Sequence, residues 1–278
     1  MNLVLVHGFL GFRQIAGIEY FNGVKQYLEA NGPLKILATK VDPDQGIAVR
    51  GGQLRRQILV ALGDLPPATD DEKAVTNSLD SSQKTHIIGH SMGGLDSRFI
   101  LSPANPNHIA SRIASLTTIS TPHRGSPIAD LIIAKIGGQR LWLWNWWMER
   151  KLHQIVTGIG VSLDGLHDLT AGGAANFNRI YVDHPQVRYF SVAGVGRTVG
   201  RPTAKILYPA YKYIKGKKRE DNDGLVAVAS AKWREFDARL WPADHADEIG
   251  HDLDRLGKSG RFDHLARFGE LVERLKQI

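Results

Sequence analysis

The chain has no cysteine among its 278 residues. This absence excludes a disulfide framework, a thiolate nucleophile and a cysteine-ligated metal, and it leaves the redox compartment open. Long apolar runs are also missing, since no stretch reaches the roughly 18 apolar residues of a membrane span. The apolar run at residues 3–6 is short and lacks the basic flank of a secretion signal. We therefore expect no transmembrane segment, and a protein that is cytoplasmic or is secreted in mature form or without a signal.

Charge and composition narrow the classes of protein further. Hydrophobic residues make up 42% of the chain and charged residues 23%, which suits an α/β domain with a sizeable core. The formal net charge is +7, but no nucleic-acid-binding motif accompanies it, so no nucleic-acid partner is expected. No internal repeat or linker is found, and residues 1–278 are predicted to form a single domain.

Strand-like and helix-like segments alternate along most of the chain. This alternation predicts a mostly parallel central sheet flanked by helices on both faces. Strands are expected at 3–6, 34–38, 85–88, 116–119 and 187–193, and helices at 18–30, 49–62, 94–101 and 265–278.

The most informative stretch is Gly89-His90-Ser91-Met92-Gly93, which lies between a predicted strand and a predicted helix. A G-x-S-x-G sequence in this setting is typical of the nucleophile elbow of α/β-hydrolases, in which a strained turn exposes the serine Oγ above the sheet. The flanking glycines let the strand and helix backbones approach each other closely. The pattern predicts Ser91 as a nucleophile.

A serine nucleophile needs a base, and the base needs an orienting acid. In α/β-hydrolases the acid and then the histidine follow the serine along the chain. Asp223, in the turn Asn222-Asp223-Gly224, and His245, in a polar loop, fit this order. Asp221 is the alternative acid, and the neighbouring glycine favours Asp223. His245 is favoured as the base because it combines a downstream loop with polar neighbours; the rival histidines are His7, His90, His251 and His264.

Ester cleavage also needs two backbone N–H groups that face the developing oxyanion, and each contributes roughly 10²- to 10³-fold in rate. Met92, directly after the nucleophile, is expected to supply one of them. Phe9 is expected to supply the other from the loop after the first strand, where it follows His7-Gly8. An ordinary strand-ending turn is the alternative interpretation of His7-Gly8.

Together these motifs resemble the bacterial true lipases of family I, the Pseudomonas/Proteus-type triacylglycerol lipases. The resemblance implies the α/β-hydrolase fold, the triad Ser91, Asp223 and His245, and an oxyanion hole formed by the N–H groups of Phe9 and Met92. The matching pieces follow the family's order over most of the chain, at residues 6–12, 49–54, 88–94, 122–126, 176–178, 222–226 and 245–248.

The resemblance also implies that Arg50 braces the oxyanion loop and that a lid covers the site and opens at a lipid surface. Residues 126–157 lie at the lid's position, after the strand that follows the elbow, and are helical in pattern. The aromatic side chains of this segment suit a lipid interface or substrate, and burial against the sheet is the alternative. They are Trp142, Trp144, Trp146 and Trp147.

Members of this family usually hold a structural calcium near the catalytic histidine. Asp247 matches one of its aspartate ligands, but His251 stands where a glutamine is expected, and residues 198–218 contain no acid. Calcium prefers several oxygen ligands, so Asp247 and His251 form a weak candidate site. Hydrogen bonds or a salt bridge from His251 are expected instead, and no cofactor is expected to be required.

Three further patterns have simpler interpretations. Residues 194–200 have a glycine spacing one residue too long for a dinucleotide fingerprint, and Pro202 blocks the helix that should follow. Residues 247–251 lack the first histidine of a zinc-protease helix. The basic segment 208–219 is interpreted as a solvated loop, with docking to anionic lipid as the alternative.

The sequence therefore predicts a serine hydrolase that cleaves carboxylic esters of fatty acids, above all acylglycerols, at an oil–water or membrane surface. Ser91 would form an acyl-enzyme, with His245 as the base and Asp223 as the orienting acid. The alternatives are a carboxylesterase of soluble esters without interfacial activation, an acyltransferase with the same triad, and a non-catalytic module on a hydrolase fold.

Overall fold

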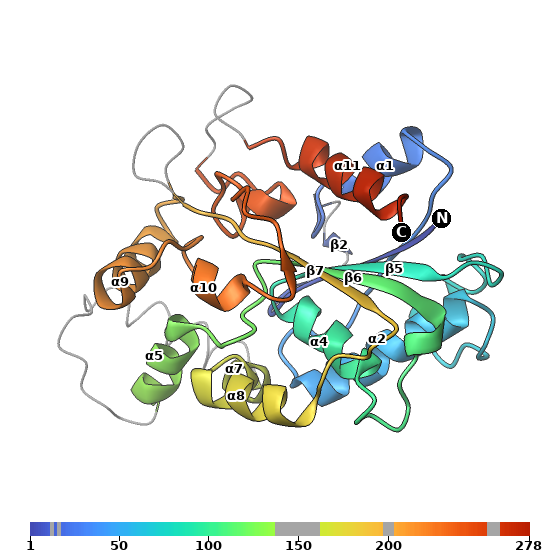
Figure 1. The fold of residues 1–278 in the computed structure, drawn as a ribbon, viewed down its shortest axis with the longest axis horizontal. Coiled ribbons are helices and arrows are strands. Elements are labelled where there is room, and N and C mark those ends of the chain that lie inside the picture. The colour runs from blue at the N-terminus through green and yellow to red at the C-terminus, as the bar shows by residue number, and fades with distance from the viewer. Residues whose placement is uncertain (12–13, 16–17, 137–161, 197–202, 255–261) are drawn as a thin grey trace.

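A six-stranded sheet crosses the computed structural model, which describes residues 1–11, 14–15, 18–136, 162–196, 203–254 and 262–278 (Figure 1). The strand order is β4-β1-β5-β6-β7-β8, and all neighbouring strands are parallel, as predicted. The strands are β1 Asn2–Val6, β4 Lys35–Ala38, β5 Thr85–His90, β6 Ile113–Ile119, β7 Arg188–Val192 and β8 Glu235–Phe236. Two short strands, β2 Gln14–Ile15 and β3 Ile18–Glu19, form a separate antiparallel pair.

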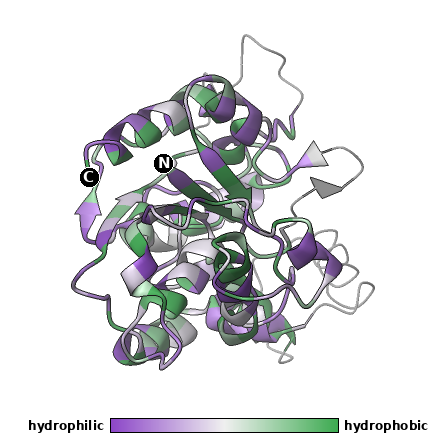
Figure 2. Cartoon of the chain, turned by 90° about the vertical axis from the view of Figure 1, so that its right-hand side faces the viewer, coloured by the Kyte–Doolittle hydropathy of each residue, from purple (hydrophilic) through white to green (hydrophobic). Residues whose placement is uncertain are grey.

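Helices cover both faces of the sheet because successive side chains of a strand point in opposite directions. On β1, Leu3 and Leu5 belong to the core under α1 (Val24–Ala30) and α11 (His264–Leu275). Val4 and Val6 belong to the core under α2 (Ile47–Ala61) and α4 (Met92–Leu101). Figure 1 shows α1 and α11 on one face of the sheet and α2 and α4 on the other. Figure 2 shows that the strands between these layers are mostly apolar.

Two expectations about local structure were wrong. The helix predicted from residue 18 begins at Val24, because Ile18–Glu19 pairs with β2 and Gly23, with φ 70°, precedes the helix. The basic segment 208–219 was interpreted as a solvated loop, but α9 (Tyr208–Lys218) occupies it. Tyr211 and Ile214 are buried on one side of α9, which anchors the segment as a helix.

The remaining helices, apart from α3 (Asp70–Lys73) and the 3₁₀ turn η1 (Ala110–Arg112), follow β6 in the chain. They are α5 (Pro127–Ile136), α7 (Asp164–Asp168), α8 (Ala171–Ile180), α10 (Val228–Ala231) and the 3₁₀ turn η2 (Asp247–Ile249). α5 begins within the predicted lid, whereas Trp142, Trp144, Trp146 and Trp147 lie outside the described residues. The N–H of Ser126 donates to the carbonyl of Leu169 at 2.8 Å, so the residue before α5 lies beside the end of α7. No helix in the described part is long and apolar enough to span a membrane.

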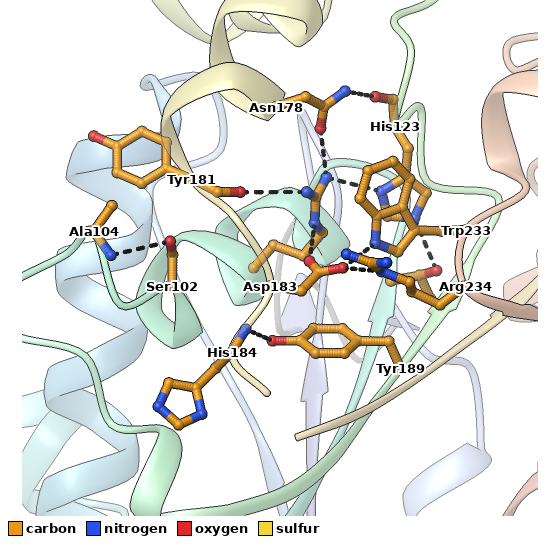
Figure 3. A network of polar contacts seen from close by, with 12 residues as sticks. Ser102, Ala104, His123, Asn178, Tyr181, Asp183, His184, Tyr189, Trp233 and Arg234 are labelled. Carbon is orange, nitrogen blue, oxygen red and sulfur yellow. Dashed lines mark hydrogen bonds and ion pairs between the residues drawn. The ribbon is translucent and has the colours of Figure 1, made fainter. Parts of the chain in front are cut away.

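A buried arginine of α4 fastens this region to the core. Nη1 of Arg98 donates to Oδ1 of Asn178 at 2.8 Å, and Nε donates to Oδ1 of Asp183 at 3.1 Å. The guanidinium carbon lies 3.9 Å from the ring centroid of Trp233, whose Nε1 donates to Asp183 at 2.8 Å. Asn178, Asp183 and Trp233 therefore converge from α8 and the segments before β7 and β8 (Figure 3).

Candidate active site

Ser91 lies in a strained turn between β5 and α4. Its φ is 54°, in the left-handed region that non-glycine residues rarely adopt. A Cβ on Gly93 would overlap the carbonyl oxygens of Val6 and His7, and a Cβ on Gly89 would lie 2.8 Å from the carbonyl carbon of Gly93. The two glycines are thus required by the close approach of strand and helix, and the predicted strand–turn–helix is present.

Asp223 and His245 form a buried hydrogen-bonded pair. Nδ1 of His245 donates to Oδ2 of Asp223 at 2.7 Å. The other oxygen, Oδ1, accepts from the N–H groups of Leu225 at 2.8 Å and Val226 at 2.7 Å. Because Asp223 engages Nδ1 as a donor, the lone pair of His245 is on Nε2, where a base needs it.

Packing places this pair beside the elbow. The ring of His245 lies against the ring of His90, with centroids 4.5 Å apart, and His90 directly precedes Ser91. Ser91 and His245 are 7% and 9% exposed, so water has little access to either residue. Within the described residues, Oγ of Ser91 has no hydrogen-bond partner, so its bond to His245 is not formed in this structure. Such bonds are often long before substrate binds.

The rival residues have other partners. Asp221 is exposed and pairs with Nζ of Lys215 at 2.5 Å. Nε2 of His251 donates to the carbonyl of Tyr20 at 2.8 Å, and Nε2 of His264 donates to the carbonyl of Asn22 at 2.7 Å. These contacts hold loops together and leave Asp223 and His245 as the pair at the elbow.

The loop after β1 lies directly over the nucleophile. A Cβ on Gly8 would be 2.7 Å from Cβ of Ser91 and 3.2 Å from its Oγ. The Gly8 carbonyl accepts from Nδ1 of His7 at 3.0 Å, from the N–H of Gly11 at 3.1 Å and from Nη2 of Arg50 at 3.3 Å. Three donors therefore fix the peptide that joins Gly8 to Phe9.

Fixing the Gly8 carbonyl also fixes the N–H of Phe9, because the two point in opposite directions from one planar trans peptide. The N–H of Met92 starts α4, where the first N–H groups of a helix have no intrahelical acceptor. In the part of the chain that the structure describes, neither N–H donates to a protein acceptor. The orientation of the Phe9 N–H is thus fixed by the structure, and the roles of Phe9 and Met92 as oxyanion donors stay predictions.

His7 supports the same loop and does not serve as a base. The N–H of Val41 donates to its Nε2 at 3.2 Å, so the ring proton is on Nδ1 and faces Gly8. Burial, together with the charge of Arg50, lowers the pKa of His7 to about 4. The imidazole is therefore neutral at physiological pH.

A buried polar network, to which the sequence analysis gave no role, underlies the site. Oε2 of Glu248 lies 3.0 Å from Nε2 of His90, and Nδ1 of His90 lies 2.7 Å from the hydroxyl of Tyr20. Burial raises the pKa of Glu248 well above its usual range and lowers that of His90 well below its own. Burial thus favours the uncharged form of both groups, while Oγ of Ser120 donates to Oε1 of Glu248 at 2.6 Å. The available sequence signal was the position of Glu248, three residues after His245.

The calcium site that the resemblance implied stays a prediction, and the described residues show how the groups around it are engaged. The one cluster of three possible ligands among the described residues, His90, His245 and Glu248, is occupied by the hydrogen bonds given above. At the position implied for calcium, Nε2 of His251 is bonded to the carbonyl of Tyr20. The carboxylate of the neighbouring Asp244 accepts three backbone N–H groups. The Asp247 carboxyl lies near those of Asp244, Asp252 and Asp254, so oxygen ligands are present in this loop, but His251 is engaged elsewhere and we assign no step to a metal.

Exposed apolar side chains lie near the site. Leu10, in the loop over Ser91, is 47% exposed, and Ile206 and Tyr208 are 66% and 40% exposed. Between these two, Leu207 packs near Gly224, next to the catalytic-acid candidate: its Cβ is 3.1 Å from where a Cβ of Gly224 would be. Apolar side chains thus border both the oxyanion loop and the loop of Asp223.

Comparisons with known proteins identify the family to which the chain belongs. The family model described as "PGAP1-like alpha/beta domain" matches residues 7–172. A triacylglycerol lipase from Saccharomyces cerevisiae is 29% identical over 94% of this chain and 72% of its own length. A triacylglycerol lipase from Vibrio cholerae is 28% identical over 99% of this chain and 87% of its own length.

Solved structures show the same fold. Staphylococcus hyicus lipase is 20% identical with a TM-score of 0.68, covering 99% of this chain and 94% of its own. A metagenomic carboxyl esterase is 18% identical with a TM-score of 0.71, covering 100% of this chain and 76% of its own. The predicted α/β-hydrolase fold is confirmed.

Proposed function

Because the chain belongs to the PGAP1-like alpha/beta domain family, we propose that it is a lipase or esterase in which Ser91, His245 and Asp223 cleave carboxylic esters. The observation that carries this proposal is the Asp223–His245 pair packed against His90, next to the strained Ser91. An ester hydrolase needs a nucleophile, base and orienting acid in this arrangement.

The reaction proceeds in two steps. In the first, Nε2 of His245 takes the proton of Ser91 Oγ as the oxygen attacks the ester carbonyl, and the N–H groups of Phe9 and Met92 stabilise the oxyanion. His245 then gives its proton to the departing alcohol, which leaves an acyl group on Ser91. In the second, His245 activates a water that releases the fatty acid and regenerates Ser91.

Fatty-acid esters, and triacylglycerols in particular, are the proposed substrates. Relatives named as triacylglycerol lipases support this class, as do the exposed Leu10, Ile206 and Tyr208 beside the site, which suit contact with an oil–water or membrane surface. The motifs of the Pseudomonas/Proteus-type lipases support the closer assignment to that group. The lid at 126–157, with its tryptophans, is part of the same proposal.

The likeness to a carboxyl esterase favours one alternative, an enzyme of soluble esters without interfacial activation. Hydrolysis of a long-chain triacylglycerol emulsion is therefore compared with that of a soluble short-chain ester. Preference for the emulsion is expected, and replacing Trp142, Trp144, Trp146 and Trp147 should remove this preference. Preference for the soluble ester, unaffected by these replacements, would establish the alternative.

Ser91→Ala tests the mechanism itself. We expect loss of activity on both substrates and loss of labelling by an alkyl phosphonate, with Ser102→Ala as the matched control. Ser102 follows the other end of α4 and accepts the N–H of Ala104 there, so its removal should leave activity within about twofold. Full activity of Ser91→Ala would refute the proposal.

A further inference from the structure

Asp96 is a fully buried carboxylate in the middle of α4 that forms an ion pair with Arg50. Its Oδ2 accepts from Nε of Arg50 at 2.9 Å and lies 2.7 Å from Nη2 of the same guanidinium. Its Oδ1 has no hydrogen-bond partner among the described residues. Arg50 and Asp96 are both 0% exposed, so the pair forms without water.

The partner of Asp96 reaches the oxyanion loop. Nη2 of Arg50 also donates to the carbonyls of His7 at 2.8 Å and Gly8 at 3.3 Å, and Nη1 donates to the carbonyl of Asp42 at 2.6 Å. Arg50 thus holds the peptide whose other side carries the N–H of Phe9. Asp96 fixes Arg50 in turn.

Asp96 shares a helix with the other oxyanion donor. α4 begins at Met92, so Asp96 follows Met92 by four residues, about one helical turn, in the same rigid element. The ion pair therefore connects the two halves of the oxyanion hole, Met92 through α4 and Phe9 through Arg50 and Gly8.

We propose that Asp96 is a positioning residue that sets the spacing between the N–H groups of Phe9 and Met92. This inference rests on the proposed ester hydrolysis at Ser91. Misplacement of a donor by about 1 Å is enough to reduce a rate by roughly 10²-fold, so the spacing needs a rigid link. The structure provides one link of this kind between α2 and α4 beneath the oxyanion loop.

Stability alone does not explain the pair. Replacing a buried ion pair by apolar residues of similar volume is often neutral or stabilising, because the desolvation of both charges opposes their attraction. Here the unpartnered Oδ1 adds an unsatisfied acceptor. Burial accordingly raises the pKa of Asp96 to about 6, although Arg50 opposes this shift. The protein could fold without the Asp96 carboxylate, whereas the orientation of the Arg50 guanidinium depends on it.

The test measures hydrolysis of a soluble short-chain ester by variants of the pair, including the single variants Arg50→Met and Asp96→Leu. Asp96→Asn keeps the shape but removes the charge. The double variant Arg50→Met/Asp96→Leu replaces the pair by apolar side chains and leaves neither charge unpaired, so it remains informative if the single variant fails to fold. Glu72→Gln is the matched control. Glu72, in α3, is largely buried and pairs at 2.8 Å with Nε of Arg56, which lies on the same helix α2 as Arg50.

We expect kcat to fall roughly 10- to 100-fold in Asp96→Asn and in the double variant. KM should stay within about twofold, because the oxyanion forms only after the ester has bound. Affinity for an alkylboronic acid, which forms a tetrahedral adduct on the serine, should fall with kcat. In the Arg50→Met background, Asp96→Leu should cost nothing further. Glu72→Gln should lower the melting temperature but leave kcat within about twofold.

An unchanged kcat in a folded double variant would overturn the inference. It would also be overturned if Asp96→Leu lowered kcat by the same factor in the wild type and in Arg50→Met. Neither outcome would affect the proposed function. That proposal fails separately, if Ser91→Ala stays active.

Discussion

Asp223 binds the imidazole of His245 with one carboxylate oxygen and two backbone N–H groups with the other, so the backbone fixes the carboxylate that we propose as the orienting acid. Asp223→Asn keeps this shape but offers an amide N–H toward Nδ1, which favours the wrong tautomer of His245. We expect kcat on a soluble ester to fall about 10³- to 10⁴-fold with the fold retained. Asp221→Asn, two residues away and exposed, should leave kcat within about twofold. Equal rates for both variants would disprove the assignment of Asp223.

A pair of glycine substitutions tests the packing of the elbow. Gly93→Ala forces a methyl group into the carbonyl oxygens of Val6 and His7, and we expect the free energy of unfolding to drop by about 3 kcal/mol. Gly52→Ala, inside α2 and with no atom within 4 Å of the added Cβ, should raise it by about 0.5–1 kcal/mol. Urea unfolding measures both. A tolerated Gly93→Ala would show that strand and helix can separate.

The dependence of stability on pH should reflect Asp247. Burial, and next the negative charges of Asp244, Asp252 and Asp254, raise its pKa from 3.8 to about 7. Between these values the folded protein binds more protons than the unfolded chain, so this carboxyl reduces stability as pH rises from about 4 to 7. Allowing for solvent screening, Asp247→Asn should be more stable than the wild type by about 1–2 kcal/mol at pH 8. At pH 4 the two should agree. Urea unfolding in a chelator, at both pH values, measures the difference, and a gain that is equal at both would contradict this account.

Removal of calcium should have little effect. His251 donates to Tyr20 in the place of the expected glutamine ligand, so the loop after His245 is held by the protein itself. We expect EGTA to change the melting temperature by less than about 2 °C and kcat by less than about twofold, the scale of a surface change that breaks no structural contact. Differential scanning fluorimetry and ester hydrolysis with and without 5 mM calcium chloride check this. Loss of folding in EGTA would mean that the acidic loop holds a cation after all.

The sequence predicted best where local pattern and tertiary structure agree. Three features were predicted from nearby residues: β1 from the apolar residues 3–6, β5 from residues 85–88, and the elbow from the glycines around Ser91. Each is specified by residues that are close together in the chain. α9 was missed because its lysines suggested a solvated loop, and its helix depends on the burial of Tyr211 and Ile214 against distant partners.

The same contrast applies to the site. Ser91, Asp223 and His245 lie in motifs with recognisable order, and the structure brings Asp223 and His245 together beside the elbow. Asp96 and Glu248 carry no comparable signal, because a single acid in a helix or loop is usually solvated. Asp96 and Glu248 acquire their contacts by burial beside Arg50 and His90, respectively. These partners are distant in the chain, so local sequence does not reveal the contacts.

The hydrogen bond from Ser126 to Leu169 joins the two ends of the excursion that follows β6. With these ends held together, insertions or deletions between them are expected to leave the strands in place, and each doubling of the length of a flexible loop costs only about 0.6 kcal/mol in closure entropy. If this segment forms the lid that we propose, changes in its length should alter the range of accepted acyl groups while Ser91, Asp223 and His245 keep their places.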